Sequence, residues 1–278
     1  MSEPRIVLED IVFGESPRWH DGRLWFSDWG AHEIVVTDLD GNRELVTEVP
    51  AFPFSIDWLP DGRLLVVANG ALVAEQDGVM EPWVELSPIT DKPWNELVVD
   101  GRGNVFVNSI GFDLMTGESP KPGMIVVVTP SGTVRRVAED LAFPNGMVVT
   151  PDSSTLVVAE SYAARLTAFD IQEDGSLANR RVWAELGDAA PDGICLDAEG
   201  AIWYADVPHR RCVRVREGGE VLQTHQLDRG GFACALGGDD RRTLLVMAAR
   251  WHGVAGVEED RTGQVLAFDA PAPGAGFP

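Results

Sequence analysis

The sequence predicts an all-β fold, a six-bladed β-propeller, and three observations support this. A short apolar stretch, a turn rich in Asp, Gly or Pro, and a strand-like run recur six times along the 278 residues. The repeats begin at Glu15, Ser55, Asn95, Asn145, Asp192 and Ala233, so successive starts lie 40, 40, 50, 47 and 41 residues apart. A period of this size with several strands in each repeat is typical of propeller blades. No convincing amphipathic helix interrupts the pattern, and we expect residues 1–278 to form one domain.

The predicted strands are short apolar runs bounded by turn residues. They include Leu64–Ala68, Val105–Val107, Met124–Val128, Leu156–Ala159 and Leu244–Met247. Nearly continuous apolar character predicts strands that are buried on both faces between stacked blades. The alternating Thr133–Val137 predicts instead a half-exposed outer strand.

Three segments lie outside the repeated pattern. A ring of blades needs a closure, because each free end exposes the edge of a sheet. We expect Arg5–Glu9 to form an N-terminal strand that completes the sixth blade beside Gln264–Asp269. The long insert from Gly111 to Gly123 is predicted to lie over the mouth of the central channel. The tail from Ala270 onward is rich in Pro and Gly and is predicted to be frayed.

Composition excludes several classes of partner. Acidic residues outnumber basic ones 44 to 22, and a net charge of −22 argues against nucleic acid and anionic membranes. The absence of a signal peptide and of an apolar run near ~18 residues predicts a cytoplasmic protein. Cys195, Cys212 and Cys234 show no pairing pattern, which favours a reducing compartment and buried thiols. Polar outer strands are compatible with a monomer or a small homo-oligomer.

Four oxygen-bearing side chains stand at nearly the same place in their repeats. Glu15, Asn95, Asn145 and Asp192 each precede their turn by seven or eight residues, so pseudo-symmetry predicts that they meet at one axis. Oxygen ligands suit a hard divalent cation, with Ca²⁺ favoured and Mn²⁺, Mg²⁺, Zn²⁺ or Fe²⁺ as alternatives. The competing interpretation is that each residue merely caps a turn.

Three motifs resemble the SMP-30/gluconolactonase/LRE-like family. They are Gly14–Trp19, Phe143–Met147 and Pro191–Asp197, and the resemblance extends from about Ile11 to Phe268. The resemblance implies a six-bladed propeller, one divalent metal in the central channel, and hydrolysis of a lactone.

The resemblance also implies roles for particular residues. It assigns the metal ligands to Glu15, Asn145 and Asp192, places Asn95 beside metal and substrate, and makes Asp192 the general base. The sugar-lactone members of the family carry Arg-x-Asn-Asp-Gly in the third blade, where this chain has Pro93–Leu97 without the arginine. Polar recognition of a sugar therefore lacks one of its usual residues.

The residues predicted to surround the substrate are largely apolar. The candidate substrate-binding residues are Asn95, Trp94, Ser109, Phe112, Trp29, Trp251 and His252, with Phe52 and Phe54 also expected near the mouth. They lead to the hypothesis that the substrate is a small, less polar lactone or ester. The alternatives are a non-catalytic, metal-stabilised propeller that binds a ligand or protein, and a promiscuous arylesterase or phosphotriesterase.

Overall fold

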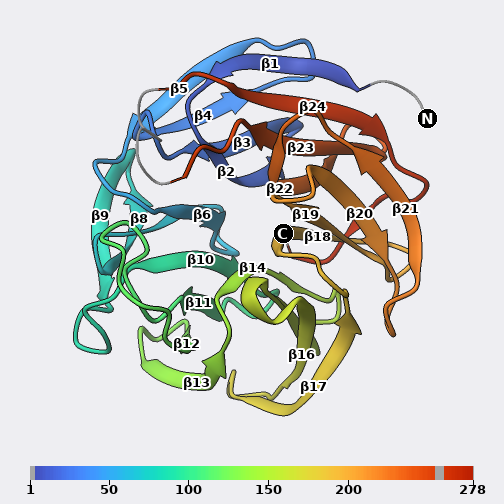
Figure 1. Cartoon of the computed structure of the whole chain (residues 1–278). Coiled ribbons are helices and arrows are strands. Elements are labelled where there is room, and N and C mark those ends of the chain that lie inside the picture. Colours follow the sequence, from blue (N-terminus) through green and yellow to red (C-terminus); the bar gives the residue numbers. More distant parts are fainter. Residues whose placement is uncertain (1–3, 254–259, 278) are drawn as a thin grey trace.

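The computed structural model describes residues 4–253 and 260–277, whose strands form six antiparallel sheets around a central axis (Figure 1). Each sheet contains four strands in consecutive spatial order, and the fifth gains one short additional strand. The sheets radiate from the axis as blades, so the prediction of an all-β six-bladed propeller is confirmed.

The strands of each blade are given from the axis outward. Blade 1 contains β2 (Gly14–His20), β3 (Arg23–Asp28), β4 (Glu33–Thr37) and β5 (Arg43–Glu48). Blade 2 contains β6 (Ser55–Trp58), β7 (Leu64–Ala68), β8 (Ala71–Gln76) and β9 (Val79–Glu85). Blade 3 contains β10 (Trp94–Val99), β11 (Val105–Ser109), β12 (Gly123–Val128) and β13 (Val134–Leu141).

The second half of the chain repeats this order. Blade 4 contains β14 (Pro144–Val149), β15 (Thr155–Glu160), β16 (Arg165–Ile171) and β17 (Leu177–Glu185), with the short helix η1 (Ser161–Ala163) after β15. Blade 5 contains β18 (Pro191–Asp197), β19 (Ile202–Asp206), β20 (Arg211–Val215) and β21 (Val221–Gln226). Blade 6 contains β22 (Gly230–Gly237), β23 (Thr243–Ala249), β24 (Gly263–Asp269) and β1 (Arg5–Ile11).

The ring closes through its two ends, as predicted. Strand β1 pairs antiparallel with β24, so the sixth blade combines one strand from the start of the chain with three from its end. Closure gives the hydrogen-bonding edge of β24 a partner. Among the described residues, no helix is long and apolar enough to cross a membrane.

The core lies between neighbouring blades. Leu72 of blade 2 and Leu97 of blade 3 belong to one cluster of buried side chains, and the other blade pairs form equivalent clusters. All three cysteines are buried, and the Sγ atoms of Cys195 and Cys234 lie 3.6 Å apart between blades 5 and 6. The prediction that these thiols are core residues is confirmed.

The C-terminal tail is ordered, and the prediction of a frayed end is wrong. Strand β25 (Gly274–Ala275) pairs with the inner strand β18, and the chain ends near the central axis (Figure 1). The Phe277 N–H donates to the Val149 carbonyl at 2.9 Å, and the Val149 N–H donates to the Phe277 carbonyl at 2.7 Å. The tail therefore caps the channel-facing edges of blades 4 and 5, whose backbone groups would otherwise lack protein partners.

Replacing Phe277 by alanine is expected to lower the free energy of unfolding by about 1–3 kcal/mol. The half-buried ring packs against the cluster around Val149 and Leu156, and the substitution removes that contact while leaving the backbone bonds. Urea unfolding followed by tryptophan fluorescence measures the change. The matched control is Val79→Ala, an exposed position on β9, which should change stability by less than about 0.5 kcal/mol.

Candidate metal centre and substrate cavity

The structure brings the four predicted donors to one cavity. Glu15, Asn95, Asn145 and Asp192 are each the second residue of the inner strand of their blade, in β2, β10, β14 and β18 respectively. All four line a cavity of about 800 Å³ that opens at one end of the central channel. Residues at the same place in successive sequence repeats therefore lie together in the structure.

A backbone irregularity accompanies each donor. Pairing between the inner strand and its neighbour shifts register at the segments containing the four donors and also in β22 of blade 6, which carries no donor, whereas β6 of blade 2 pairs regularly. Bulges of this kind bend a strand and redirect a side chain, and they are common beside active sites. The local sequence pattern did not predict these bulges.

Glycines follow two of the donors because the inner strands approach closely. A Cβ on Gly146 would lie 2.6 Å from the Ile194 nitrogen, and one on Gly193 would lie 2.5 Å from the Ala233 Cβ. Only glycine permits this approach without backbone movement. The glycines of the Asn145-Gly146 and Asp192-Gly193 pairs therefore allow the inner strands that carry the donors to pack closely around the axis.

The amide nitrogens of the two donor asparagines have protein contacts. The Asn145 Nδ2 donates to the Ser161 Oγ at 3.4 Å, and the Asn95 Nδ2 contacts the Pro144 carbonyl at 3.5 Å. Because these contacts use the amide nitrogens, the Oδ1 atoms are left to act as ligands.

The two carboxylates share an environment that disfavours their charge. Burial raises the pKa of Glu15 well above its usual range, and repulsion from Asp192 and Glu96 adds to the effect. Burial likewise raises the pKa of Asp192, with Glu96 as the next cause. A bound cation would offset this buried negative charge, and no arginine or lysine side chain is hydrogen-bonded to either carboxylate among the described contacts.

A network of buried polar side chains lies next to the donors, and it was not predicted from the sequence. The Arg18 guanidinium contacts the Glu96 carboxylate at 3.3 Å and donates to the Leu97 carbonyl at 2.9 Å. The Ser55 hydroxyl donates to the same carboxylate at 3.0 Å. Burial nevertheless raises the pKa of Glu96, against the opposing effect of Arg18. The feature of the sequence that could have indicated this network is the position of Glu96 directly after the donor Asn95.

The side chain of Asn108 connects two of the donor-bearing strands. Its Nδ2 donates to the Asn145 carbonyl at 2.7 Å, and its Oδ1 accepts from the Glu96 N–H at 3.2 Å. Asn108 is fully buried, so it fixes the spacing between blades 3 and 4 from behind the cavity.

The donor set fits a hard divalent cation. Two buried carboxylates supply the charge, and two amide oxygens extend the set without adding repulsion. Within the described ranges no group of three His, Cys, Asp or Glu side chains is placed to hold a metal, so the asparagines are needed to complete the site. The remaining coordination positions would be available to water or substrate.

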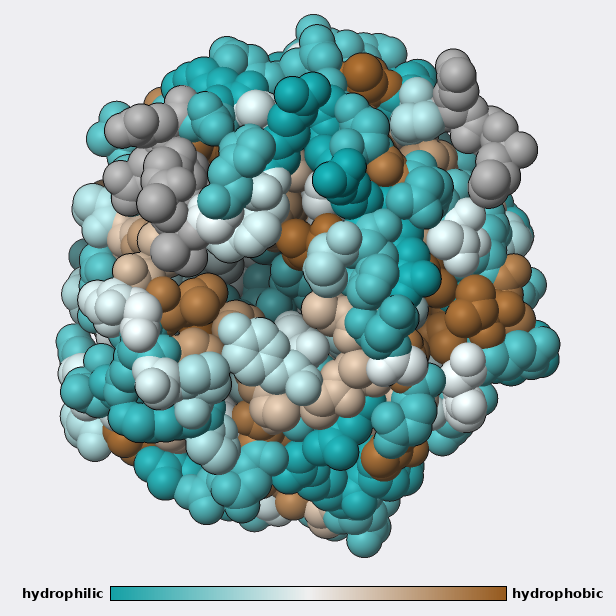
Figure 2. Space-filling view, viewed as in Figure 1, coloured by the Kyte–Doolittle hydropathy of each residue, from teal (hydrophilic) through white to brown (hydrophobic). Residues whose placement is uncertain are grey.

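The mouth of the cavity is a hollow on the face shown in Figure 2. As predicted, the insert after β11 contributes to its border, with Asp113, Leu114 and Met115 among the lining residues. Glu118 fixes this insert by ion pairs with Lys92 at 2.9 Å and with Lys121. The hydrogen bonds from these lysines lower the pKa of Glu118 to about 2, so it stays charged at neutral pH.

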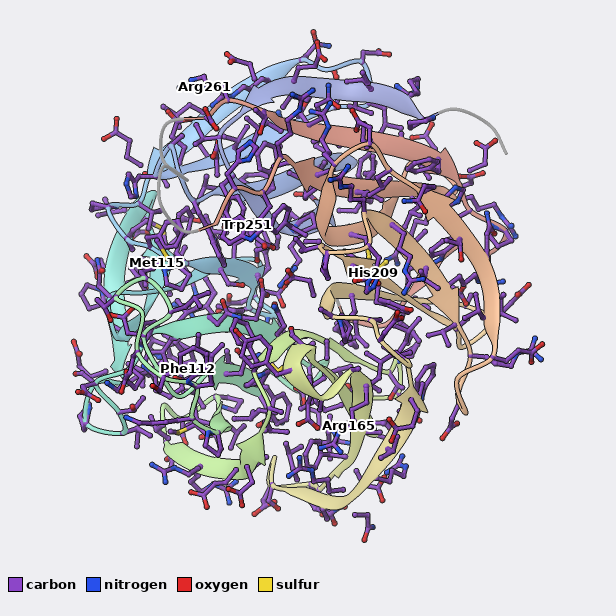
Figure 3. All side chains as sticks on the ribbon, in the orientation of Figure 1. Phe112, Met115, Arg165, His209, Trp251 and Arg261 are labelled. Atoms are coloured by element: carbon purple, nitrogen blue, oxygen red, sulfur yellow. The ribbon has the colours of Figure 1, made fainter. Side chains whose placement is uncertain are left out.

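Three of the predicted substrate-binding aromatic and histidine side chains do line the cavity. They are Trp29, Trp251 and His252, and Trp251 lies beside the central opening in Figure 3. The His252 imidazole is exposed at the rim, with its Nε2 4.0 Å from the Asp260 carboxylate.

The structure places Trp94, Ser109 and Phe112 behind the cavity wall. The Trp94 ring is buried between blades 2 and 3, because adjacent residues of a strand face opposite ways and Asn95 takes the cavity side. Ser109 is fully buried and accepts from the Gly111 N–H at 3.4 Å. Phe112 packs beneath Phe143, with ring centroids 5.7 Å apart, and lies away from the opening in Figure 3.

Several lining residues were not predicted. They include Phe13, Phe143, Ser161, Tyr162, Arg210, Arg229 and Phe232, most of them in loops between blades or at the first residues of inner strands. Phe13 and Phe143 each stand two residues before a donor in the sequence, which is the signal that could have identified them.

Comparisons with known proteins match one family over most of the chain. The model of the family described as SMP-30/Gluconolactonase/LRE-like region matches residues 13–250. Regucalcin from Danio rerio is 28% identical over 88% of this chain and 85% of its own length. The 6-deoxy-6-sulfogluconolactonase of Pseudomonas putida is also 28% identical, over 98% of this chain and 92% of its own. The solved structure of the calcium-binding protein regucalcin from Agrobacterium tumefaciens superposes with a TM-score of 0.81 at 21% identity, covering 99% and 95% of the two chains.

Proposed function

Because this chain belongs to the SMP-30/Gluconolactonase/LRE-like family, we propose that it is a metal-dependent lactonase. The observation that carries the proposal is the convergence of Glu15, Asn95, Asn145 and Asp192 on one cavity. Relatives named for lactone hydrolysis, the 6-deoxy-6-sulfogluconolactonase and a pentonolactonase of Haloferax volcanii, support the reaction class. The reaction adds water across the ring ester and yields a hydroxy acid.

The proposed metal ligands are Glu15, Asn145 and Asp192, with Asn95 beside metal and substrate. Oxygen donors favour Ca²⁺, which accepts six to eight ligands in flexible geometry, over Mn²⁺, Mg²⁺, Zn²⁺ or Fe²⁺. When bound, such a cation polarises a carbonyl oxygen and makes a water molecule easier to deprotonate.

Asp192 is proposed to act also as the general base. Its carboxylate lines the cavity beside the other donors, and a carboxylate within reach of the attacking water can accept its proton. Asp192 would take the proton of the attacking water and return it to the ring oxygen as the ester bond breaks.

A panel of lactones and aryl esters tests the proposal. Ring opening at neutral pH releases one proton, so an indicator dye follows the reaction directly. We expect turnover with Ca²⁺ or Mn²⁺ that is lost in EDTA and restored by excess metal. No turnover of any ester, combined with a melting temperature raised by metal, would instead support a non-catalytic, metal-stabilised binding protein.

A further inference from the structure

Five aromatic rings form one wall of the cavity, contributed by blades 1, 2 and 6. They are Phe13, Trp29, Phe52, Phe232 and Trp251. The Phe13 ring lies at the centre of the group. Its centroid is 4.6 Å from that of Phe232, the nearest of the other four rings, and 6.5 Å from that of Phe52, the farthest for which a ring contact is found. The rings therefore present a continuous apolar surface between the donors and the rim.

A second apolar group comes from blades 3 and 4, across the ring. Phe143 and Tyr162 lie with centroids 4.7 Å apart, and Ile110 and Met115 border them in the same cavity. A ligand that reaches the donors at the floor must pass between two hydrophobic walls.

Most polar side chains along these walls already have protein partners. The Trp29 indole N–H donates to the Phe54 carbonyl, and the Ser161 hydroxyl donates to the Pro191 carbonyl at 2.7 Å. The Arg229 guanidinium is held by the Asp228 carboxylate and the Thr262 carbonyl. The Asp113 carboxylate accepts from the backbone of its own loop. The remaining polar lining side chains, those of Tyr162, Arg210, Arg250 and His252, are on exposed residues.

A sugar lactone carries several hydroxyl groups, and each needs a hydrogen-bond partner once it leaves water. Of the residues that the structure describes, few on these walls could supply such a partner between the floor and the rim. We infer that the cavity selects lactones whose ring bears an apolar alkyl or aryl substituent, held between the two aromatic walls while the ester group lies at the donors. This inference rests on the proposed lactonase function and specifies its substrate class.

Three δ-lactones with the same six-membered ring test the inference. They are δ-decanolactone, which carries a pentyl chain, unsubstituted δ-valerolactone, and the polyhydroxylated glucono-δ-lactone. Each kcat/KM is divided by the uncatalysed hydrolysis rate, which removes differences in intrinsic reactivity. We expect δ-decanolactone to exceed each of the other two by about 100-fold.

Phe52→Ala tests the wall itself. Phe52 is half-buried and lies against Trp29 with centroids 5.3 Å apart, so its loss opens the wall without emptying the core. We expect kcat/KM for δ-decanolactone to fall about 10-fold, with little change for δ-valerolactone. A general loss of structure would lower both equally. Phe277→Ala, the same chemical change at the other end of the channel, is the matched control and should leave the ratio unchanged.

The possible outcomes distinguish a wrong substrate class from a wrong reaction. Equal or greater efficiency with glucono-δ-lactone would overturn the inference while leaving the lactonase intact. The lactams that correspond to δ-decanolactone and δ-valerolactone resist hydrolysis. Their binding affinities, measured by calorimetry, give a readout that does not depend on turnover. Tighter binding of the alkylated lactam without turnover of any lactone would support the apolar cavity and contradict the proposed reaction. Equal binding of the two lactams would overturn the inference.

Discussion

Replacing Asp192 by alanine is expected to reduce kcat/KM for a lactone about 10³-fold. The substitution removes one of two charged metal ligands and the proposed general base together. Steady-state rates measured at saturating metal are the direct check.

A conservative replacement separates the two roles of Asp192. Asp192→Asn keeps an oxygen ligand of similar size, so metal binding should weaken less than in the alanine variant. The loss of the base should still lower kcat about 10²-fold. Asp57→Asn is the matched control, because Asp57 is also a buried inner-strand carboxylate but lines the opposite end of the channel. Near-normal kcat in Asp192→Asn would contradict the assignment of the base.

Replacing Glu15 by glutamine is expected to stabilise the metal-free protein while abolishing its response to metal. Without a cation, the Glu15 carboxylate is buried beside Asp192 and Glu96, and its raised pKa shows that the charged form is disfavoured. Removing that charge should raise the free energy of unfolding by about 1–3 kcal/mol. For a chain of this size, the melting temperature should rise by roughly 2–4 °C per kcal/mol.

Metal should stabilise the wild type much more than the Glu15→Gln variant. At 100 times the dissociation constant, a cation adds about 2.7 kcal/mol to the stability of the wild type. Glu15→Gln lacks one charged ligand, so the same concentration should add far less. Differential scanning calorimetry with EDTA or Ca²⁺ measures both quantities. A destabilised apo variant with an unchanged metal response would show that Glu15 serves the fold rather than the cation.

The architecture and the donors were predictable because both follow from repetition. A repeat of about 40–50 residues fixed the number of blades, and the equal phase of Asn145 and Asp192 within their repeats placed them at the same level of the channel. Closure by the N-terminal strand followed from the need to pair a free sheet edge.

Other features depend on contacts that no local pattern encodes. The tail around Gly274 has the composition of a loop, yet it pairs with β18 because that edge faces the channel without another partner. The orientation of Trp94 was predictable from strand alternation, since its neighbour Asn95 faces the cavity. The walls around Phe13 and Phe143 come from loops and strand starts of different blades, and only the assembled ring brings them together.

The most direct test of a shared cation at the hub is anomalous scattering from a crystal soaked in Mn²⁺ as a substitute for Ca²⁺. We predict one strong anomalous peak within roughly 2.0–2.6 Å of oxygen atoms from Glu15, Asn145 and Asp192. The peak should disappear in crystals of Glu15→Gln treated in the same way. A peak bound to other residues, or none in the wild type at saturating Mn²⁺, would contradict the account.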